Sequence, residues 1–514
     1  MPARKIPFDR TPGQDALEIT IVDDLKVVVP NDLSQMTPFV LLEQEDWFED
    51  EIGFIRKLAQ PGVNMLDIGA NFGLYTLAMA KAIGGDGRFW AVEPASNTAG
   101  FLRRSVAAND FKAIEVLQMA LSDSDGDGYL TIESSSELNA LADGPGANTE
   151  QVKLSTLDKL MAEQFGDVQF DFMKIDAEGA ESAILKGGKA FFEQQSPLVM
   201  YELKHRNQVN TQLIQQFADM GYEPYHLIPG IDVLVPFSLS DEIDGYKLNL
   251  FACKSDCADR LVERGFLLKS AEPGEAPAVD WDDYVAMQGW VVHAGLDFGP
   301  WVSGDALPEP DKQLRLALCH WGAAHKADAS AADRYAHLKT AMELVSGIPA
   351  MNDSAAPGHG LIRLTASRIT ADLGNRVQRV TWLSDVLRSF STGKVLINKP
   401  FLAVAERFDD LSPDGQLMNW LGVSLAETID AKSRFSSFFT LPRDSYDIFK
   451  NLMQYPLLCA ETVRRYMLCI QASGAKVDGG YPAGFKPVAE AAPDNRNPDL
   501  WRPYLAADVQ QQQG

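Results

Sequence analysis

The first residues that could do chemistry form a glycine loop behind an apolar run. Residues 64–80 read NMLDIGANFGLYTLAMA: Asp67 ends the apolar run, Gly69 and Gly73 stand in the loop, and a helical pattern follows. This order places backbone N–H groups at a helix start, where they bind anionic groups of a nucleotide. The middle glycine of the dinucleotide motif is missing, and the Asp67 carboxylate would repel a pyrophosphate. The loop therefore suits a cofactor with a cationic end.

A second acid ends the next apolar run, RFWAVE, at Glu93, which Pro94 follows. An acid at the end of a second strand can accept hydrogen bonds from both hydroxyls of a ribose. S-adenosylmethionine has a ribose, an ammonium and a sulfonium, and its carboxylate can use the helix N-terminus. Either acid alone is ordinarily a cap or a loop residue. On consecutive strands, the two together predict S-adenosylmethionine as the cofactor.

Candidate catalytic residues lie in MKIDAEGAE, residues 173–181. Lys174 and Asp176 share a face of a predicted strand, and Asp176 falls at its carboxyl end, where open α/β sheets bind ligands. We expect Asp176 to face the cofactor amine or the acceptor hydroxyl, with Lys174 or Glu178 assisting proton removal. A lysine base needs a pKa strongly lowered by burial, whereas a neighbouring carboxylate raises it. Lys174 as a base and Lys174 as an ion-pair partner of Asp176 therefore both stay open. Glu181 is expected to be a first-turn helix acid.

The next predicted strand ends in YELKH and adds Glu202 and His205. Glu202 is a candidate pocket residue. His205 could act as a base near neutral pH, and its ordinary alternative is a solvated loop histidine. Asp176, Glu178 and Glu202 could also hold a divalent cation that binds two substrate hydroxyls, but strand-end acids do not require one, and no metal ligand is assigned.

These residues need a fold that brings several strand ends together. Apolar segments with little alternation predict strands at VNMLDI, RFWAVE, IEVLQMAL, FDFMKID and PLVMYEL. Amphipathic helices are predicted between them at 74–82, 97–109, 156–165, 180–192 and 207–220. This alternation predicts an α/β, doubly wound, mostly parallel sheet over residues 61–255, covered by helices on both faces. YEPYHLI and LNLFACK, separated by a polar loop, are expected to close it as an antiparallel pair.

Other segments flank or interrupt this sheet. Residues 1–60 read as an N-terminal extension of short strands plus a helix that ends at Pro61-Gly62. GYLTIES and EQVKLS are expected to form a hairpin around the polar loop 134–149, with a mobile tip. We expect this insertion and the C-terminal half to shape much of the acceptor pocket.

The C-terminal half changes character. Residues 256–283 are expected to be a linker, because KSAEPGEAPAVDWDD is rich in Pro, Ala, Gly and acid. Residues 284–505 have apolar residues at helical spacing and predict an all-α domain, with a helical-hairpin array as one arrangement. Six of its tryptophans are expected to pack between helices rather than to stack on sugars. The tail 506–514 is expected to be disordered.

The composition of the chain excludes some classes of function. The chain has 514 residues and a net charge of −25, which argues against a broad nucleic-acid or anionic-membrane surface. No stretch has the roughly 18 apolar residues of a membrane span. Five scattered cysteines fit a reducing compartment, and we expect a cytoplasmic protein.

The sequence resembles the FkbM family of S-adenosylmethionine-dependent methyltransferases over about residues 54–254. The matching segments, in order, are LDIGANFGLYT, WAVEPAS, FLRRSVAAND, ALSDSDGDG, LSTLDKL, DFMKIDAEGAESAILKGG, PLVMYELKH and NLFACK. The resemblance implies a Rossmann-like class I methyltransferase that usually acts on a hydroxyl group. It also implies cofactor contacts: Asp67, Gly69, Ala70, Asn71 and Gly73 at the methionine end, Glu93 with Pro94 at the ribose, and Ala120, Leu121 and Ser122 beside the adenine.

The predicted function is O-methylation of a hydroxyl on a carbohydrate, a glycoconjugate or a secondary metabolite. One alternative is a nitrogen or carboxylate acceptor, which the same cofactor site would serve. Another is a cofactor-binding scaffold whose helical half is an interaction module. The helical half could recognise the acceptor, bind a partner protein or mediate self-association, and the sequence leaves these open.

Overall fold

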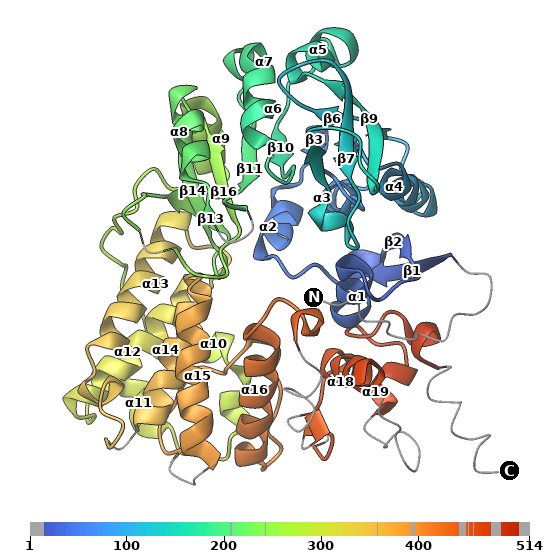
Figure 1. Cartoon of the computed structure of the whole chain (residues 1–514). Helices are drawn as coiled ribbons and strands as arrows, with labels where there is room; N and C mark the ends of the chain where they lie inside the picture. Colours follow the sequence, from blue (N-terminus) through green and yellow to red (C-terminus); the bar gives the residue numbers. More distant parts are fainter. Residues whose placement is uncertain are drawn as a thin grey trace, which may run out of the picture.

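The chain forms a sheet-containing part and a helical part, joined by the N-terminal segment (Figure 1). The computed structural model describes residues 15–205, 208–241, 243–356, 358–391, 395, 397–440, 449–450, 452–455, 457–473 and 485–502. The predicted tail 506–514 lies outside the described residues.

The central sheet has eight strands in the order β15-β14-β16-β11-β10-β3-β4-β5. Five neighbouring strands are parallel: β11 (Leu198–Glu202), β10 (Phe172–Ile175), β3 (Val63–Ile68), β4 (Gly87–Val92) and β5 (Ile114–Leu117). Three antiparallel strands complete one side: β16 (Asn249–Cys253), β14 (Glu223–Ile228) and β15 (Val233–Pro236). The predicted doubly wound, mostly parallel sheet with an antiparallel close is confirmed. Strand β15 lies in a segment that we expected to be a loop.

Helices cover both faces of this sheet, as the apolar strands require. One face packs against α2 (Asp50–Leu58), α3 (Leu74–Ala82), α4 (Ser96–Ala108) and α9 (Ser255–Glu263). The other face packs against α5 (Leu157–Leu160) with its π-helical extension Met161–Phe165, α6 (Glu181–Gly187), α7 (Lys189–Gln194) and α8 (Thr211–Asp219). Side chains alternate between the two cores along each strand, for example Met65 toward the first and Leu66 toward the second.

Two predicted elements are each divided in the structure. The predicted strand IEVLQMAL forms β5 and the separate β6 (Ala120–Leu121), because the chain turns at Met119, whose N–H bonds to the Leu117 carbonyl. The predicted helix 180–192 forms α6 and α7, which meet at two glycines. A Cβ on Gly187 would lie 2.1 Å from the Ser122 carbonyl oxygen, so glycine allows α6 to approach the loop after β6.

The insertion folds into a small sheet in the order β6-β9-β7-β8. The predicted hairpin is the antiparallel pair of β7 (Gly126–Thr131) and β9 (Thr149–Ser155). The loop between them contains the short helix η2 (Ser136–Leu138) and β8 (Ala140–Ala142), which the sequence did not predict. The insertion therefore has regular structure of its own.

The N-terminal extension links the two parts. Its strands β1 (Ala16–Ile21) and β2 (Leu25–Pro30) pair as predicted, and β2 packs on α4. An unpredicted helix, α1 (Met36–Gln44), packs against α18 (Ala460–Ser473) of the helical half. Two acids of this region, Glu43 and Glu45, are buried and contact Arg464 and Arg465.

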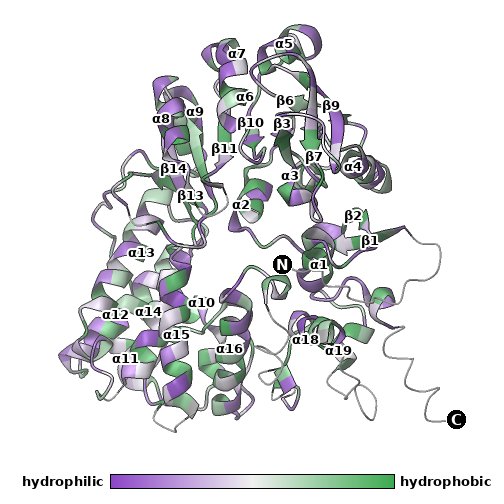
Figure 2. Cartoon of the chain, in the orientation of Figure 1, coloured by the Kyte–Doolittle hydropathy of each residue, from purple (hydrophilic) through white to green (hydrophobic). Residues whose placement is uncertain are grey.

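The helical half begins with α10 (Trp281–Met287), and no strand longer than a single bridge occurs in its described residues. Its other helices are α11 (Gly299–Ser303), α12 (Glu309–Ala324), α13 (Ala331–Ser346), α14 (His359–Asp372), α15 (Arg376–Ser391), α16 (Leu417–Lys432), α18 and α19 (Lys486–Ala489), with short 3-10 turns between them. From α12 to α16 each helix packs against the next, and apolar and polar residues share each helix (Figure 2). Trp290, Trp321 and Trp420 are buried in this core.

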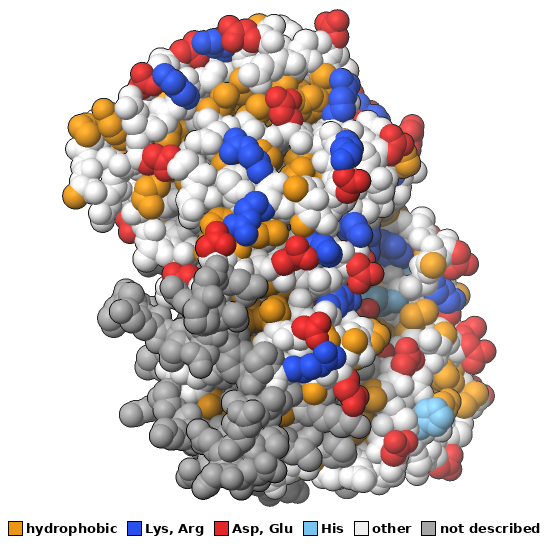
Figure 3. All heavy atoms as spheres, turned by 90° about the vertical axis from the view of Figure 1, so that its right-hand side faces the viewer, with side chains coloured by type: hydrophobic (Ala, Val, Ile, Leu, Met, Phe, Trp, Pro, Cys, Tyr) orange, Lys and Arg blue, Asp and Glu red, His pale blue; other side chains and the backbone are white. Residues whose placement is uncertain are grey.

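Charges are mixed on the face seen in Figure 3, where acidic and basic side chains are interspersed. Among the described residues, no helix is both long and apolar enough to cross a membrane.

Candidate active site

The site lies where the parallel strands β3, β4 and β10 end, at one edge of the sheet. It is a pocket of about 980 Å³, counted out to the solvent. Of the residues predicted to bind the cofactor, eight line it: Gly69, Ala70, Asn71, Glu93, Pro94, Ala120, Leu121 and Asp176. These come from strand ends that lie far apart in the sequence, and the parallel topology places them at one edge.

The glycine loop passes directly over the end of β10. Gly69 has φ +75°, and a Cβ at this position would lie 1.8 Å from the Asp176 carbonyl oxygen. Any side chain would therefore push the loop off the strand end. The loop ends at Gly73, which precedes α3 with φ +81°. The N–H groups of Gly69 and Ala70 donate to the Val92 carbonyl, and that of Gly73 donates to the Ala70 carbonyl, so these bonds fix the loop, which we call the glycine cradle, beside the end of β4.

Glu93 holds the loop from the end of β4. Its carboxylate accepts hydrogen bonds from the backbone N–H groups of Asn71 and Ala95, both at 2.9 Å. The side chain is 6% exposed, and burial raises its pKa to about 7. Glu93 also lines the pocket.

Three predicted cofactor residues do not line the pocket. Asp67 is 1% exposed beneath the loop, where one carboxylate oxygen accepts from the Thr76 hydroxyl at 2.7 Å and the other has no hydrogen bond. Gly73 caps α3, and the backbone N–H of Ser122 bonds to the Ser155 carbonyl. Asp67, which we expected to contact the cofactor directly, therefore does not line the pocket, although it lies only two residues before Gly69 in the sequence.

Lys174 and Asp176 form an ion pair at 2.8 Å, and Lys174 is 5% exposed. Burial lowers the pKa of Lys174, but Asp176, Asp67 and Glu49 around it raise the pKa by more, to a value well above the ordinary one. The ammonium therefore stays protonated at neutral pH. Of the two interpretations that the sequence left open, the geometry favours the ion-pair partner over the base.

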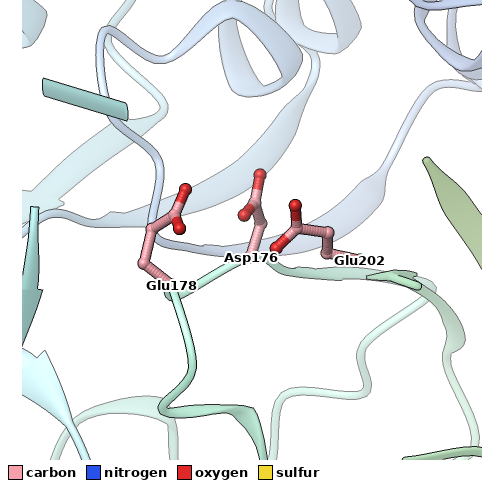
Figure 4. A group of neighbouring side chains, drawn as sticks. All are labelled: Asp176, Glu178 and Glu202. Atoms are coloured by element: carbon pink, nitrogen blue, oxygen red, sulfur yellow. The ribbon is translucent and has the colours of Figure 1, made fainter. Parts of the chain in front are cut away.

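Three carboxylates come together as the sequence suggested. Asp176, Glu178 and Glu202 offer oxygens that lie within 4.8 Å of one another, with Asp176 between the other two (Figure 4). Burial and mutual repulsion raise the pKa of Glu178 to about 8 and that of Glu202 to about 10. Such a group can share protons or hold a hard divalent cation. Glu178 lines the pocket, whereas Glu202 lies behind Asp176 at the end of β11.

Two further sequence candidates have different outcomes. Glu181 accepts hydrogen bonds from the backbone N–H groups of Ala177 and Gly179, so it stabilises the turn before α6, in keeping with its expected structural role. His205 belongs by its backbone to the two-residue strand β12 (Lys204–His205), and its side chain lies outside the described part of the structure.

Sequence reasoning missed the wall opposite the glycine loop. It is built by Thr37, Trp47 and Glu49 of the N-terminal extension and by Ser136, Glu137, Asn139 and Leu141 of the insertion. Ser136 donates a hydrogen bond to the Asn71 side chain at 2.9 Å, and Thr37 bonds to Glu137. The insertion contributes to the pocket as expected. The helical half contributes no residue to the described lining, contrary to our expectation, because the N-terminal extension occupies that side.

Glu49 is the most notable of these missed residues. The Tyr75 hydroxyl and the Asn249 amide both donate to its Oε2 atom, the second at 3.0 Å. Burial raises its pKa above the ordinary value, and Lys174 and the hydrogen bonds oppose that effect. The segment EDWFEDEIG shows a cluster of acids and aromatics, but no local pattern tells which acid points toward the strand ends.

The donor set fits S-adenosylmethionine. Gly69 allows the loop to lie close over the end of β10, the Glu93 carboxylate that would accept the ribose hydroxyls lines the pocket, and Ala120 and Leu121 offer an apolar surface. Lys174 and Asp176 provide an ion pair at the end of β10.

One family model and several solved structures are similar to part of this chain. Residues 67–224 match the family model described as the methyltransferase FkbM domain. A search among curated proteins gave no match. Similar solved structures include methyltransferase FkbM from Methylobacillus flagellatus KT, with 16% identity over 40% of this chain and 50% of that chain and a TM-score of 0.26. A SAM-dependent methyltransferase from Aquifex aeolicus has 14% identity over 42% and 91%, with a TM-score of 0.25. A SAM-dependent O-methyltransferase from Thermotoga maritima has 14% identity over 40% and 64%, with a TM-score of 0.23.

At these TM-scores the fold assignment rests on the strand order described above, and the family assignment rests on the matched segment. The order β5-β4-β3-β10-β11-β16-β14 and the glycine cradle at β3 both fall in or beside that segment. Residues 67–224 are therefore a methyltransferase FkbM domain, and S-adenosylmethionine is its expected cofactor.

Proposed function

We propose that this domain transfers a methyl group from S-adenosylmethionine to a hydroxyl group of a carbohydrate, a glycoconjugate or a similar polyhydroxylated molecule. When bound, the cofactor supplies a methyl group already activated on a sulfonium. The protein must then align the acceptor and accept the proton of its hydroxyl group.

The observation that carries this proposal is the charge of the acceptor side. Glu49, Asp176 and Glu178 line it, and Lys174 is the one cation in the described lining. Carboxylates accept hydrogen bonds from hydroxyl groups and can remove a proton from one. Because Lys174 stays protonated and holds Asp176, the proton acceptor is sought among the other acids.

Glu49 is our candidate for this base. Tyr75 and Asn249 fix its carboxylate, and burial raises its pKa above the ordinary value, which makes the carboxylate a stronger base. Asp176, held by Lys174, would accept a hydrogen bond from the acceptor hydroxyl or from the cofactor amine. Glu178, with a pKa of about 8, is the second candidate for the base.

Trp47 supports a sugar as the acceptor. Its indole lines the same wall as Glu49, and an aromatic face beside carboxylates matches a sugar ring, which has an apolar face and a hydroxyl rim.

The test begins with calorimetric titration by S-adenosylhomocysteine, with NAD as a control. Labelled methyl transfer is then screened over sugars, amines and carboxylates, and the product is identified by mass spectrometry and NMR. We expect S-adenosylhomocysteine alone to bind and the methyl group to appear on a sugar hydroxyl. Transfer only to an amine or a carboxylate would overturn the proposed acceptor. Absence of S-adenosylhomocysteine binding would overturn the enzyme assignment and favour the scaffold alternative.

A further inference from the structure

A second pocket lies between the N-terminal segment and the helical half. It has a volume of about 760 Å³, counted out to the solvent, and we call it the helical-side pocket. Its walls are residues 44–53 on one side and α15, α16 and α18 on the other. In Figure 1 the chain between α1 and α2 passes between the sheet above and α16 below. Trp47 and Glu49 line both this pocket and the pocket of the candidate active site, which we call the methyl-transfer pocket. The two pockets are therefore neighbours across these side chains.

Two cations of this pocket have no carboxylate partner among the described residues. Arg376, at the start of α15, donates from Nε to the Lys432 carbonyl at 2.7 Å, and its guanidinium lies 4.5 Å from the centre of the Tyr246 ring. Lys432, the last residue of α16, has no hydrogen bond or ion pair from its ammonium in the described structure. Burial is the largest cause that lowers both pKa values. Asp50 opposes the shift of each cation, and for Lys432 the charges of Arg379 and Arg376 lower the pKa further while Glu461 raises it. Adjacent, partly buried like charges are unfavourable unless an anion compensates them.

A third cation adds an unsatisfied donor. Arg465 is 3% exposed, lines the pocket and contacts Glu43 and Glu461 through Nη2. Its Nη1 atom makes no hydrogen bond, and the nearest carboxylate oxygen, on Asp430, is 3.8 Å away. A buried guanidinium donor without an acceptor is rare in a folded protein, and a ligand oxygen would satisfy it.

The acids of the pocket are mostly occupied elsewhere. Asp46 pairs with Arg56 at 2.6 Å, and Glu461 pairs with Arg465 at 2.8 Å. Glu49 is held by Tyr75 and Asn249, as described above. Asp50 acts electrostatically on Arg376 and Lys432, but it forms no ion pair with either in the described structure and is exposed at the first turn of α2. On the inner wall formed by α15, α16 and α18, Arg376 and Lys432 therefore lack a direct carboxylate contact among the described residues.

We propose that the helical-side pocket binds an oxyanion of the methyl acceptor, a phosphate or a carboxylate group. Arg376 and Lys432 bind this group, while a hydroxyl of the same acceptor reaches past Trp47 to Glu49 in the methyl-transfer pocket. The helical half then recognises the acceptor, although it contributes nothing to the described lining of the methyl-transfer pocket. That the bound anion belongs to the methyl acceptor rests on the proposed function. Anion binding itself can be measured without it.

The experiment measures anion binding to the full chain by calorimetry. Inorganic phosphate, glucose 6-phosphate, glucuronate and neutral glucose are titrated in turn, with S-adenosylhomocysteine as a separate readout. The variants are Lys432→Gln, which removes a charge that makes no hydrogen bond or ion pair in the described structure, and Lys432→Arg, which keeps it. Lys189→Gln, an exposed lysine on α7, is the matched control.

We expect inorganic phosphate to bind and Lys432→Gln to weaken it by about tenfold or more, the effect of one lost charge-assisted hydrogen bond. Lys432→Arg and Lys189→Gln should bind as the wild type does, and all four proteins should bind S-adenosylhomocysteine alike. Tighter binding of glucose 6-phosphate than of glucuronate assigns a phosphate group, and the reverse assigns a carboxylate. The proposal is overturned if none of the three anions binds, or if Lys432→Gln binds them as the wild type does. If the wild type does not bind S-adenosylhomocysteine, the proposed function is contradicted, but the result on anion binding still holds.

Discussion

The two sides of the methyl-transfer pocket are built in different ways. The cofactor side consists of the loops that directly follow β3 and β4 and of the short strand β6, so each contributing residue lies in its strand or next to it in the sequence. The acceptor side is assembled from the N-terminal extension, the insertion and the end of β10, which tertiary packing brings together. The cofactor side therefore depends on local backbone geometry, and the acceptor side depends on long-range contacts.

The long-range contacts anchor the acceptor wall on the helical half. The Glu45 carboxylate accepts from the backbone N–H groups of Arg496 and Asn497, and Glu43 accepts from Ser437. Arg464 donates from Nε to the Glu43 carbonyl at 2.7 Å. Trp47 and Glu49 follow these anchors by only a few residues, so the C-terminal helices hold the acceptor wall in place without lining the methyl-transfer pocket.

The largest effect on cofactor affinity is expected from Gly69→Ala. The new Cβ would lie 1.8 Å from the Asp176 carbonyl oxygen at a φ of +75°, so the loop must move. We expect S-adenosylhomocysteine affinity to fall by at least about a hundredfold, since a shift of this size removes several loop contacts together. Calorimetry measures it, and Gly100→Ala in α4, where a Cβ meets nothing within 4 Å, should bind normally. Unchanged affinity in Gly69→Ala would contradict the cradle.

Glu49→Gln tests the acceptor side, and it should change the reaction rate rather than cofactor affinity. The amide can keep the hydrogen bonds from Tyr75 and Asn249 but cannot take a proton, so the methyl-transfer rate should fall by about a hundred- to ten-thousand-fold. S-adenosylhomocysteine affinity should stay near that of the wild type. Steady-state rates with an acceptor from the screen, and calorimetry on the same samples, separate the two effects. Glu193→Gln, an exposed acid on α7, is the control, and a full rate in Glu49→Gln would move the base to Glu178.

The difference between the two sides also explains what could be predicted from the sequence. The strand ends carrying Gly69, Glu93 and Asp176 could be found because apolar runs and glycine spacing are local signals. Glu49 could not, because its position depends on how residues 36–49 lie across the sheet edge and on Tyr75 and Asn249, which are distant in sequence. The local pattern also placed Asp67 at the pocket wall, whereas in the structure it is buried and bonded to the Thr76 hydroxyl.

Glu93→Gln should have a smaller effect than the loop substitution. Glu93 accepts two backbone N–H groups and is expected to accept the ribose hydroxyls, and an amide oxygen can replace part of this but not its charge. We expect S-adenosylhomocysteine affinity to fall by about tenfold, the effect of weakening one or two charge-assisted hydrogen bonds. Binding of phosphate in the helical-side pocket should be unaffected. If Glu93→Gln and the wild type bind S-adenosylhomocysteine with equal affinity, Glu93 does not contribute to cofactor binding.

The smallest effect concerns stability and pH at the acidic cluster. The folded-state pKa values of Glu178 and Glu202, about 8 and about 10, lie above the ordinary value of 4.5. The folded protein therefore keeps protons that the unfolded chain has released, so the stability that these groups contribute is complete below pH 4.5 and is lost as the pH rises through 8 and 10. Melting temperatures should therefore fall between pH 5 and pH 9. The fall should be shallower in the double variant Glu178→Gln with Glu202→Gln. Some fall should remain there, because Glu93, with a pKa of about 7, contributes in the same direction. A slope as steep in the double variant as in the wild type would mean that these two carboxylates are not protonated in the folded state, and Asp176 would then face two negative charges instead of two neutral acids.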